Sequence, residues 1–208
     1  MVRDLDWEDA ISRQSNERSR SSLAALWEGH QRFLASRTQG RNYEQPILQS
    51  LAASPNPIAA VVACSDSRVA PEILFDRGLG DLFVSRVPGN VASDGTKWML
   101  EIAVTELKVP LVIVVGHTGC LAIAQSVEGR TAMAGGTLRY DVARAVDRAR
   151  MSHSADLYFG AVRENVLLTL ENLRRESYAT QNAIRDGTLG LVGAVYDMPS
   201  GVVTLIDS

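Results

Sequence analysis

Two short stretches of this chain carry side chains that could bind a metal. The sequence CSDSR occupies residues 64–68, and HTGC occupies residues 117–120. Thiolates and imidazoles are soft ligands that suit Zn²⁺, and a catalytic zinc keeps three protein ligands with a fourth position open. A histidine and a cysteine three residues apart can share one side of a turn. The spacing therefore predicts a zinc site formed by Cys64, His117 and Cys120.

Each of these residues also has a simpler interpretation. A free cysteine often behaves as a small apolar side chain, and His117 could be an ordinary residue at a strand end. Cys64 and Cys120 could form a redox pair or a disulfide, although redox pairs usually lie close together as C-x-x-C. Asp66 and Arg68 could form a surface ion pair of little energetic value. From the residues alone, the combination favours the metal site and leaves these alternatives open.

Both stretches follow apolar runs that predict buried β-strands, Ile58–Cys64 and Leu111–Gly116. Residues 81–87 predict another strand, and residues 96–107 predict a helix that joins it to the strand at 111–116. Strand, helix and strand of this apolarity indicate a right-handed crossover in a parallel sheet. Ligands of such sheets bind beyond the carboxyl ends of the strands, which is where both stretches lie.

The remaining pattern predicts an α/β fold, with a central mostly parallel β-sheet flanked by helices. Further helices are expected at residues 15–36, 119–127, 139–151 and 159–177, and two strands at 189–207 about a turn at 198–201. The whole chain, 1–208, is interpreted as one domain. Residues 1–40 are expected to form an N-terminal helical arm outside the main sheet, followed by a polar link at 36–46. Thr118 is expected to cap the helix that starts near Cys120.

Histidines away from the candidate site are interpreted as solvated residues. His30 is assigned to the polar side of the helix at 15–36, and His153 to a polar link between helices. Nothing in the sequence brings either of them near the metal ligands.

Composition limits the possible partners. The chain has 208 residues, 46% of them hydrophobic, and a net charge of −3 from 21 basic and 24 acidic residues. Its basic residues are scattered, so neither nucleic acid nor an anionic membrane is an expected partner. No run of about 18 apolar residues predicts a membrane span, and the charged N-terminus lacks an apolar signal core. We therefore expect a cytoplasmic protein with a small-molecule substrate.

The motifs "CSDSRV", "DLFVSRVPGN" and "GHTGC", in this order, resemble those of the β-class carbonic anhydrases, whose pattern is C-x-D-x-R followed by H-x-x-C. The resemblance extends to "WEGHQRFLASR", "AVTELKVPLVIVVGH" and "GTLGLVGAVYD". It implies one Zn²⁺ per chain on Cys64, His117 and Cys120, with Asp66 and Arg68 as a catalytic dyad. The implied activity is the reversible hydration of CO2 to bicarbonate and a proton by zinc-bound hydroxide. The family's minimum assembly implies a homodimer or higher homo-oligomer, with the N-terminal arm packed on a partner subunit.

The resemblance also implies a substrate pocket, from which this chain departs at several positions. The implied pocket residues are Phe83, Gly89, Asn90, Ile102 and Pro55. Pro55 stands where the family often has glutamine, Ile102 where tyrosine is common, and Leu121 where glycine usually follows the second cysteine. A more apolar pocket suits uncharged CO2. It leaves two alternatives: a hydrolase of carbonyl sulfide or carbon disulfide on the same zinc site, and a non-catalytic homologue that senses bicarbonate or serves in an assembly.

Overall fold

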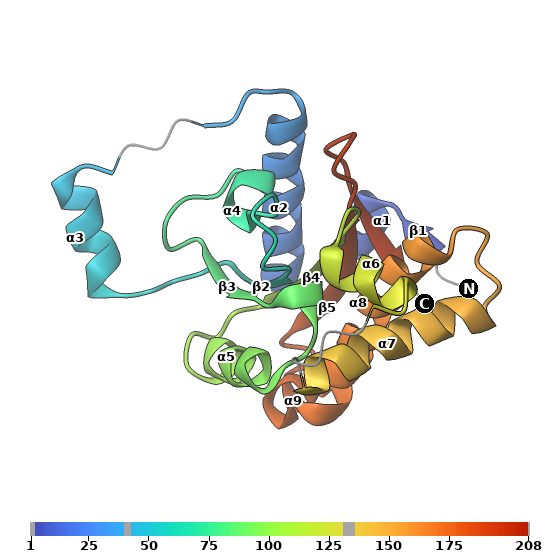
Figure 1. Ribbon diagram of the computed structural model, residues 1–208. Coiled ribbons are helices and arrows are strands. Elements are labelled where there is room, and N and C mark those ends of the chain that lie inside the picture. Colours follow the sequence, from blue (N-terminus) through green and yellow to red (C-terminus); the bar gives the residue numbers. More distant parts are fainter. Residues whose placement is uncertain (1–2, 40–42, 131–135, 208) are drawn as a thin grey trace.

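A six-stranded β-sheet forms the centre of the protein (Figure 1). The computed structural model describes residues 3–39, 43–130 and 136–207. The strands are β1 (Arg3–Leu5), β2 (Ala59–Ala63), β3 (Leu82–Arg86), β4 (Leu111–His117), β5 (Gly190–Tyr196) and β6 (Val203–Asp207). Their order is β1-β6-β5-β4-β2-β3; β3, β2, β4 and β5 are parallel, β6 is antiparallel to β5, and β1 is antiparallel to β6. The prediction of a mostly parallel sheet is confirmed.

The sheet separates two layers of helices (Figure 1). The helical segments are α1 (Trp7–Ser12), α2 (Glu17–Leu34), α3 (Gln45–Ala53), α4 (Pro71–Leu74), the 3-10 turn η1 (Pro88–Asn90), α5 (Asp94–Thr105), α6 (Leu121–Val127), α7 (Gly136–Met151), α8 (Leu157–Glu176) and α9 (Tyr178–Arg185). Successive residues of a strand point to opposite faces. Val62 accordingly packs in a cluster with Val166 of α8, and Val61 packs in a second cluster with Leu23 of α2. Both faces are buried, which explains the continuous apolar runs of the parallel strands.

Helix α2 covers one face of the sheet, so the expectation that it lies outside the sheet is wrong. Leu23 and Leu26 are fully buried in the same cluster as Ile113 of β4. Trp7 of α1 stacks on Trp27 of α2 with ring centroids 4.9 Å apart and extends this layer. Helical periodicity identified the apolar face but not the surface it covers. Of the predicted arm, residues 1, 2 and 40 lie outside the described residues.

Helix α3 is not among the predicted helices: its first two residues fall in the predicted link at 36–46, and residues 47–53 have no predicted element. It begins at Gln45, and Pro46 stands in its first turn, where proline is well tolerated. None of its residues is buried, and it stands away from the rest of the protein (Figure 1). Residues 40–42 of the predicted link lie outside the described residues. In the part of the chain that the structure describes, no helix combines the length and apolarity that crossing a membrane requires.

His30 is fully buried, which contradicts its assignment to a solvated surface. Its Nδ1 lies 3.1 Å from the carbonyl oxygen of Leu74, and its Nε2 accepts a hydrogen bond of 2.9 Å from the Val203 N–H. Because Nε2 is an acceptor, Nδ1 carries the proton and the ring is neutral. His30 thus links α2 to α4 and β6, and burial lowers its pKa. His153 is exposed, as expected.

Acid is expected to destabilise the fold through His30, because protonation would remove the acceptor for Val203. The pKa of His30 in the fold lies below its unfolded value of about 6.5, so its contribution is complete above that value and is lost as the pH falls. When the pH falls from about 7.5 to about 5.5, the free energy of unfolding of the parent protein should decrease by roughly 1 kcal/mol more than that of the His30→Gln variant. Urea denaturation measures this difference. The control variant His153→Gln should keep the parent's pH dependence. If His30→Gln also kept it, His30 would not be the residue through which acid destabilises the fold.

Candidate metal centre

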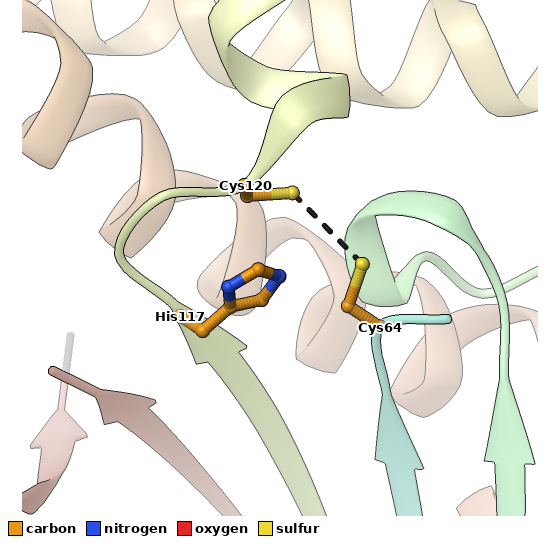
Figure 2. Close-up of side chains that lie close together, drawn as sticks. All are labelled: Cys64, His117 and Cys120. Carbon is orange, nitrogen blue, oxygen red and sulfur yellow. Dashed lines mark hydrogen bonds between the residues drawn. The ribbon is translucent and has the colours of Figure 1, made fainter. Parts of the chain in front are cut away.

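The three predicted ligands meet at the carboxyl edge of the parallel strands. Ala63 of β2 pairs with Val115 of β4, so the residues that follow, Cys64 and His117, leave the sheet at the same edge. Cys120 precedes the first residue of α6. One ligand atom from each of the three side chains lies within 4.8 Å of the others, and the two sulfur atoms are 4.0 Å apart (Figure 2). The structure therefore brings together all three side chains that the spacing singled out.

His117 presents one ring nitrogen to this group. Its Nδ1 lies 2.9 Å from the carbonyl oxygen of Thr118 and donates to it, so Nε2 carries the lone pair. Nε2 is buried and has no hydrogen-bond partner among the described residues. Buried polar atoms are rarely left unpaired, and a metal ligand needs such a lone pair. Two sulfurs and one imidazole nitrogen are a donor set that fits Zn²⁺.

The two thiols influence each other strongly because they are close together and buried. Accepting a hydrogen bond from the Cys120 thiol lowers the pKa of Cys64, and the Gly89 N–H lowers it further. The same contact, together with burial, raises the pKa of Cys120. Deprotonating both would leave two negative charges 4.0 Å apart in a buried place. A divalent cation between them would compensate both charges, so this pair of thiols suits a metal better than it suits two free thiolates.

Asp66 and Arg68 form a tight pair beside the ligands. The Arg68 backbone N–H and Nε donate to Oδ1 of Asp66 at 3.0 and 2.9 Å, and Nη2 donates to Oδ2 at 2.8 Å. The Arg68 guanidinium therefore holds the pKa of Asp66 well below its usual range. Nη2 also donates to the carbonyl oxygen of Gly119 at 3.0 Å. The pair joins the two ligand-bearing loops, which an isolated surface ion pair would not do.

Arg86, at the end of β3, was not singled out from the sequence. Its Nε donates to the carbonyl oxygen of Cys64 at 3.0 Å, and its Nη2 donates to the carbonyl oxygen of Asp66. It thereby fixes the main chain between the first ligand and the dyad. Its place in the "DLFVSRVPGN" stretch was the available signal.

Thr118 does not cap the following helix, which contradicts the prediction. Helix α6 begins at Leu121, and its N-terminal cap is Cys120, without a side-chain hydrogen bond. Thr118 lies too far before the first turn to reach its N–H groups. Its hydroxyl instead donates to Oδ1 of Asp197 at 3.2 Å and accepts from the Met198 N–H at 2.9 Å. These bonds tie the second ligand loop to the turn between β5 and β6.

The five predicted pocket residues do not all lie beside the metal ligands. Gly89 is at the site, because its N–H lies 3.4 Å from Sγ of Cys64, and Asn90 is buried beside it. Phe83 pairs with Ala60, near the start of β2. The other two are Ile102, half-buried on α5, and Pro55, exposed in the link between α3 and β2. Contact of Phe83, Ile102 and Pro55 with a substrate stays a prediction.

Comparison with known proteins supports the motif-based resemblance. A family model described as carbonic anhydrase matches residues 59–203. Carbonic anhydrase 2 of Mycobacterium tuberculosis is 36% identical over 191 residues, covering 88% of this chain and 90% of that protein. The solved structure of the β-carbonic anhydrase CcaA is similar, with a TM-score of 0.67 and 29% identity over 88% of this chain and 86% of that one. The fold is shared with tetrameric β-carbonic anhydrases from Sordaria macrospora, with a TM-score of 0.64 and 22% identity over 89% of this chain and 93% of that one.

Metal analysis of the purified protein tests the ligand set directly. We expect about one zinc per chain, because two thiolates and an imidazole match its softness and tetrahedral preference. Cys64→Ser should lose the metal, because a hydroxyl is a far weaker ligand than a thiolate. Ser67→Ala, at an exposed position in the same loop, should keep it. Elemental analysis after gel filtration gives the stoichiometry. Freshly reduced protein with no metal, or with a Cys64–Cys120 disulfide, would refute the site.

Proposed function

Because the chain belongs to the β-carbonic anhydrase family, we propose that it catalyses the reversible hydration of CO2 to bicarbonate and a proton at a zinc ion held by Cys64, His117 and Cys120. One observation carries the proposal: two buried sulfurs and an unpartnered imidazole nitrogen converge beside a paired carboxylate. When bound, zinc would supply an activated water as the nucleophile.

Asp66 and Arg68 would position that nucleophile. The low pKa of Asp66 keeps its carboxylate ionised near neutral pH, so it is available as a hydrogen-bond acceptor. An O–H directed at this carboxylate would leave the oxygen lone pair free to face CO2, which is catalysis by orientation. Arg68 holds the carboxylate on both oxygens and thereby keeps its direction. In this role Asp66 accepts a hydrogen bond without taking the proton.

The proposed substrate pocket is apolar on the side of α5 and β3. Phe83 and Ile102 are half-buried apolar side chains, and Pro55 provides no hydrogen-bond donor at its position. CO2 carries no charge and no dipole, so such walls would accept it more readily than bicarbonate. The same property would admit carbonyl sulfide or carbon disulfide, and this makes a sulfide-releasing hydrolase the second candidate.

Cytoplasmic localisation is proposed on chemical grounds. Both cysteines are free and buried, and both are needed as reduced sulfur ligands. A reducing compartment keeps thiols in that state.

Stopped-flow CO2 hydration, run beside a sulfide-release assay, tests the activity and the roles of the dyad. The zinc-loaded protein should hydrate CO2 and release little sulfide. Asp66→Asn and Arg68→Ala should each keep zinc and lose roughly 100-fold or more in kcat/KM, because both disturb the acceptor that orients the nucleophile. Ser67→Ala, between them, should retain parental activity.

Other results of these assays would overturn specific parts of the proposal. Sulfide release without hydration would favour the hydrolase. Silence in both assays with zinc bound would favour a bicarbonate-sensing or assembly homologue. An Arg68→Ala variant as active as the parent would remove the dyad from the mechanism.

We also propose that the protein is a homodimer or higher homo-oligomer, with the N-terminal segment against a second copy. Four large apolar residues of α2 already pack within the chain and do not need that partner: Leu23, Leu26, Trp27 and Phe33. Helix α3 differs, because Ile47 and Leu48 are 43% and 38% exposed and none of its residues is buried. Exposed apolar side chains grouped on one short helix favour contact with another protein surface. We therefore extend the proposed contact from residues 1–40 to α3.

Light scattering of single-residue variants tests this assembly. The protein should have the mass of a dimer or a multiple of it, and Ile47→Glu should shift the mass toward that of the monomer, because the interface would have to bury a charge. Met151→Glu is the matched control, since Met151 is 79% exposed on α7, outside α3. A monomeric parent would refute the assembly. An Ile47→Glu variant with the parent's mass would remove α3 from the interface.

A further inference from the structure

Helix α8 carries two buried polar side chains one turn apart. Asn165 and Thr169 are 1% and 2% exposed, although most of the buried residues of this helix are apolar. Both donate to the same turn: Nδ2 of Asn165 lies 2.6 Å from the carbonyl oxygen of Gly89, and the hydroxyl of Thr169 lies 3.3 Å from the carbonyl oxygen of Asn90. Oδ1 of Asn165 is buried and has no hydrogen-bond partner among the described residues, so Nδ2 makes the side chain's hydrogen bond. Buried polar groups are costly unless they are hydrogen-bonded. The two side chains thus hold the η1 turn from the helix side.

The same turn contacts the candidate metal centre. The N–H of Gly89 lies 3.4 Å from Sγ of Cys64. Gly89 is therefore held at both ends, with its N–H on the sulfur and its carbonyl on Asn165. It has a φ of +69°, and an added Cβ would lie 3.0 Å from Val142, so glycine is required there. The hydrogen bond from α8 is on its carbonyl oxygen, at 2.6 Å.

An N–H that donates to a thiolate changes how that sulfur binds a metal. It stabilises negative charge on the sulfur in a buried site, where such hydrogen bonds are strong. It also reduces the electron density that the sulfur gives to the metal. Hydrogen bonds of this kind to ligands commonly affect metal affinity and reactivity by large factors.

We propose that Asn165 is a positioning residue which, through Gly89, keeps an N–H on the Cys64 sulfur and so tunes the metal site from helix α8. Thr169 acts in the same way on the neighbouring carbonyl and makes a smaller contribution. This inference rests on the proposed zinc site, but it concerns the chain's own contacts.

The experiment compares Asn165→Leu with Asn172→Leu. Asn172 lies on the same helix and is 3% exposed, but its side-chain oxygen accepts from Arg175 rather than holding the η1 turn. Each metal-free variant is reloaded with Co²⁺, and the sulfur-to-cobalt charge-transfer absorption is recorded. Zinc affinity is then measured by competition with a chromogenic chelator. Thermal unfolding of the metal-free variants shows how far each substitution destabilises the fold.

We expect the charge-transfer band of Asn165→Leu to move to longer wavelength, because a sulfur without its N–H is a better electron donor. Its zinc affinity should nevertheless fall roughly 10-fold or more, because the negative charge on the buried sulfur loses the N–H that stabilises it. Thr169→Val should show a smaller shift in the same direction, and it serves as the test if Asn165→Leu does not fold. Asn172→Leu should have the parent's spectrum and affinity.

The experiment distinguishes a failure of the proposed metal site from a failure of the proposed role of Asn165. A parent protein that binds neither Co²⁺ nor Zn²⁺ would refute the proposed metal site. A parent that binds both, with the same spectrum and affinity in Asn165→Leu and Thr169→Val, would overturn the role of Asn165 and leave the metal site intact. Equal changes of the charge-transfer band and the zinc affinity in Asn165→Leu and Asn172→Leu would show that general destabilisation of the fold causes them, and would overturn the specific role of Asn165.

Discussion

The site depends on the register between β2 and β4. Ala63 pairs with Val115, and both strands end within two residues of that pair. Parallel strands direct their carboxyl ends to the same edge, so this register brings together side chains that are far apart in the sequence. Gly116 permits the arrangement, because a Cβ there would lie 2.6 Å from Val166 of α8. Close contact between β4 and α8 also places Asn165 near the η1 turn.

The strand ends alone would not fix all three ligands: His117 is the last residue of β4, but Cys64 and Cys120 lie in loops. Hydrogen bonds to other parts of the chain fix these loops. Arg86 donates to the carbonyls of Cys64 and Asp66, and Thr118 joins the second loop to the β5–β6 turn. Most of these donors bond main-chain oxygens, so they set the path of the chain and leave the sulfur and imidazole atoms available. Such support is what a preformed metal site requires.

The sequence was informative where one physical signal dominates. The apolar runs predicted β2 and β4 to within about one residue, because strands buried on both faces contain few polar residues. It failed where tertiary packing decides. His30 was assigned to the surface because the layer formed by Trp7 and Phe75 over its helix could not be foreseen. Asn165 was missed for the same reason, since its role depends on a turn 76 residues away in the chain.

The Asp66–Arg68 pair bears on whether the Asp66 carboxylate could itself bind the metal. Both carboxylate oxygens of Asp66 accept hydrogen bonds from Arg68. Arg68 also donates to the carbonyl oxygen of Gly119, which lies in the chain between the ligands His117 and Cys120. Movement of Asp66 onto a metal would break the charge-assisted hydrogen bonds to Arg68. It would also leave the arginine with Gly119 as its only described partner in this site, and so loosen the link between the two ligand loops. The described geometry therefore holds the Asp66 carboxylate on Arg68, and Arg68 links the loop of Cys64 to the loop of Cys120.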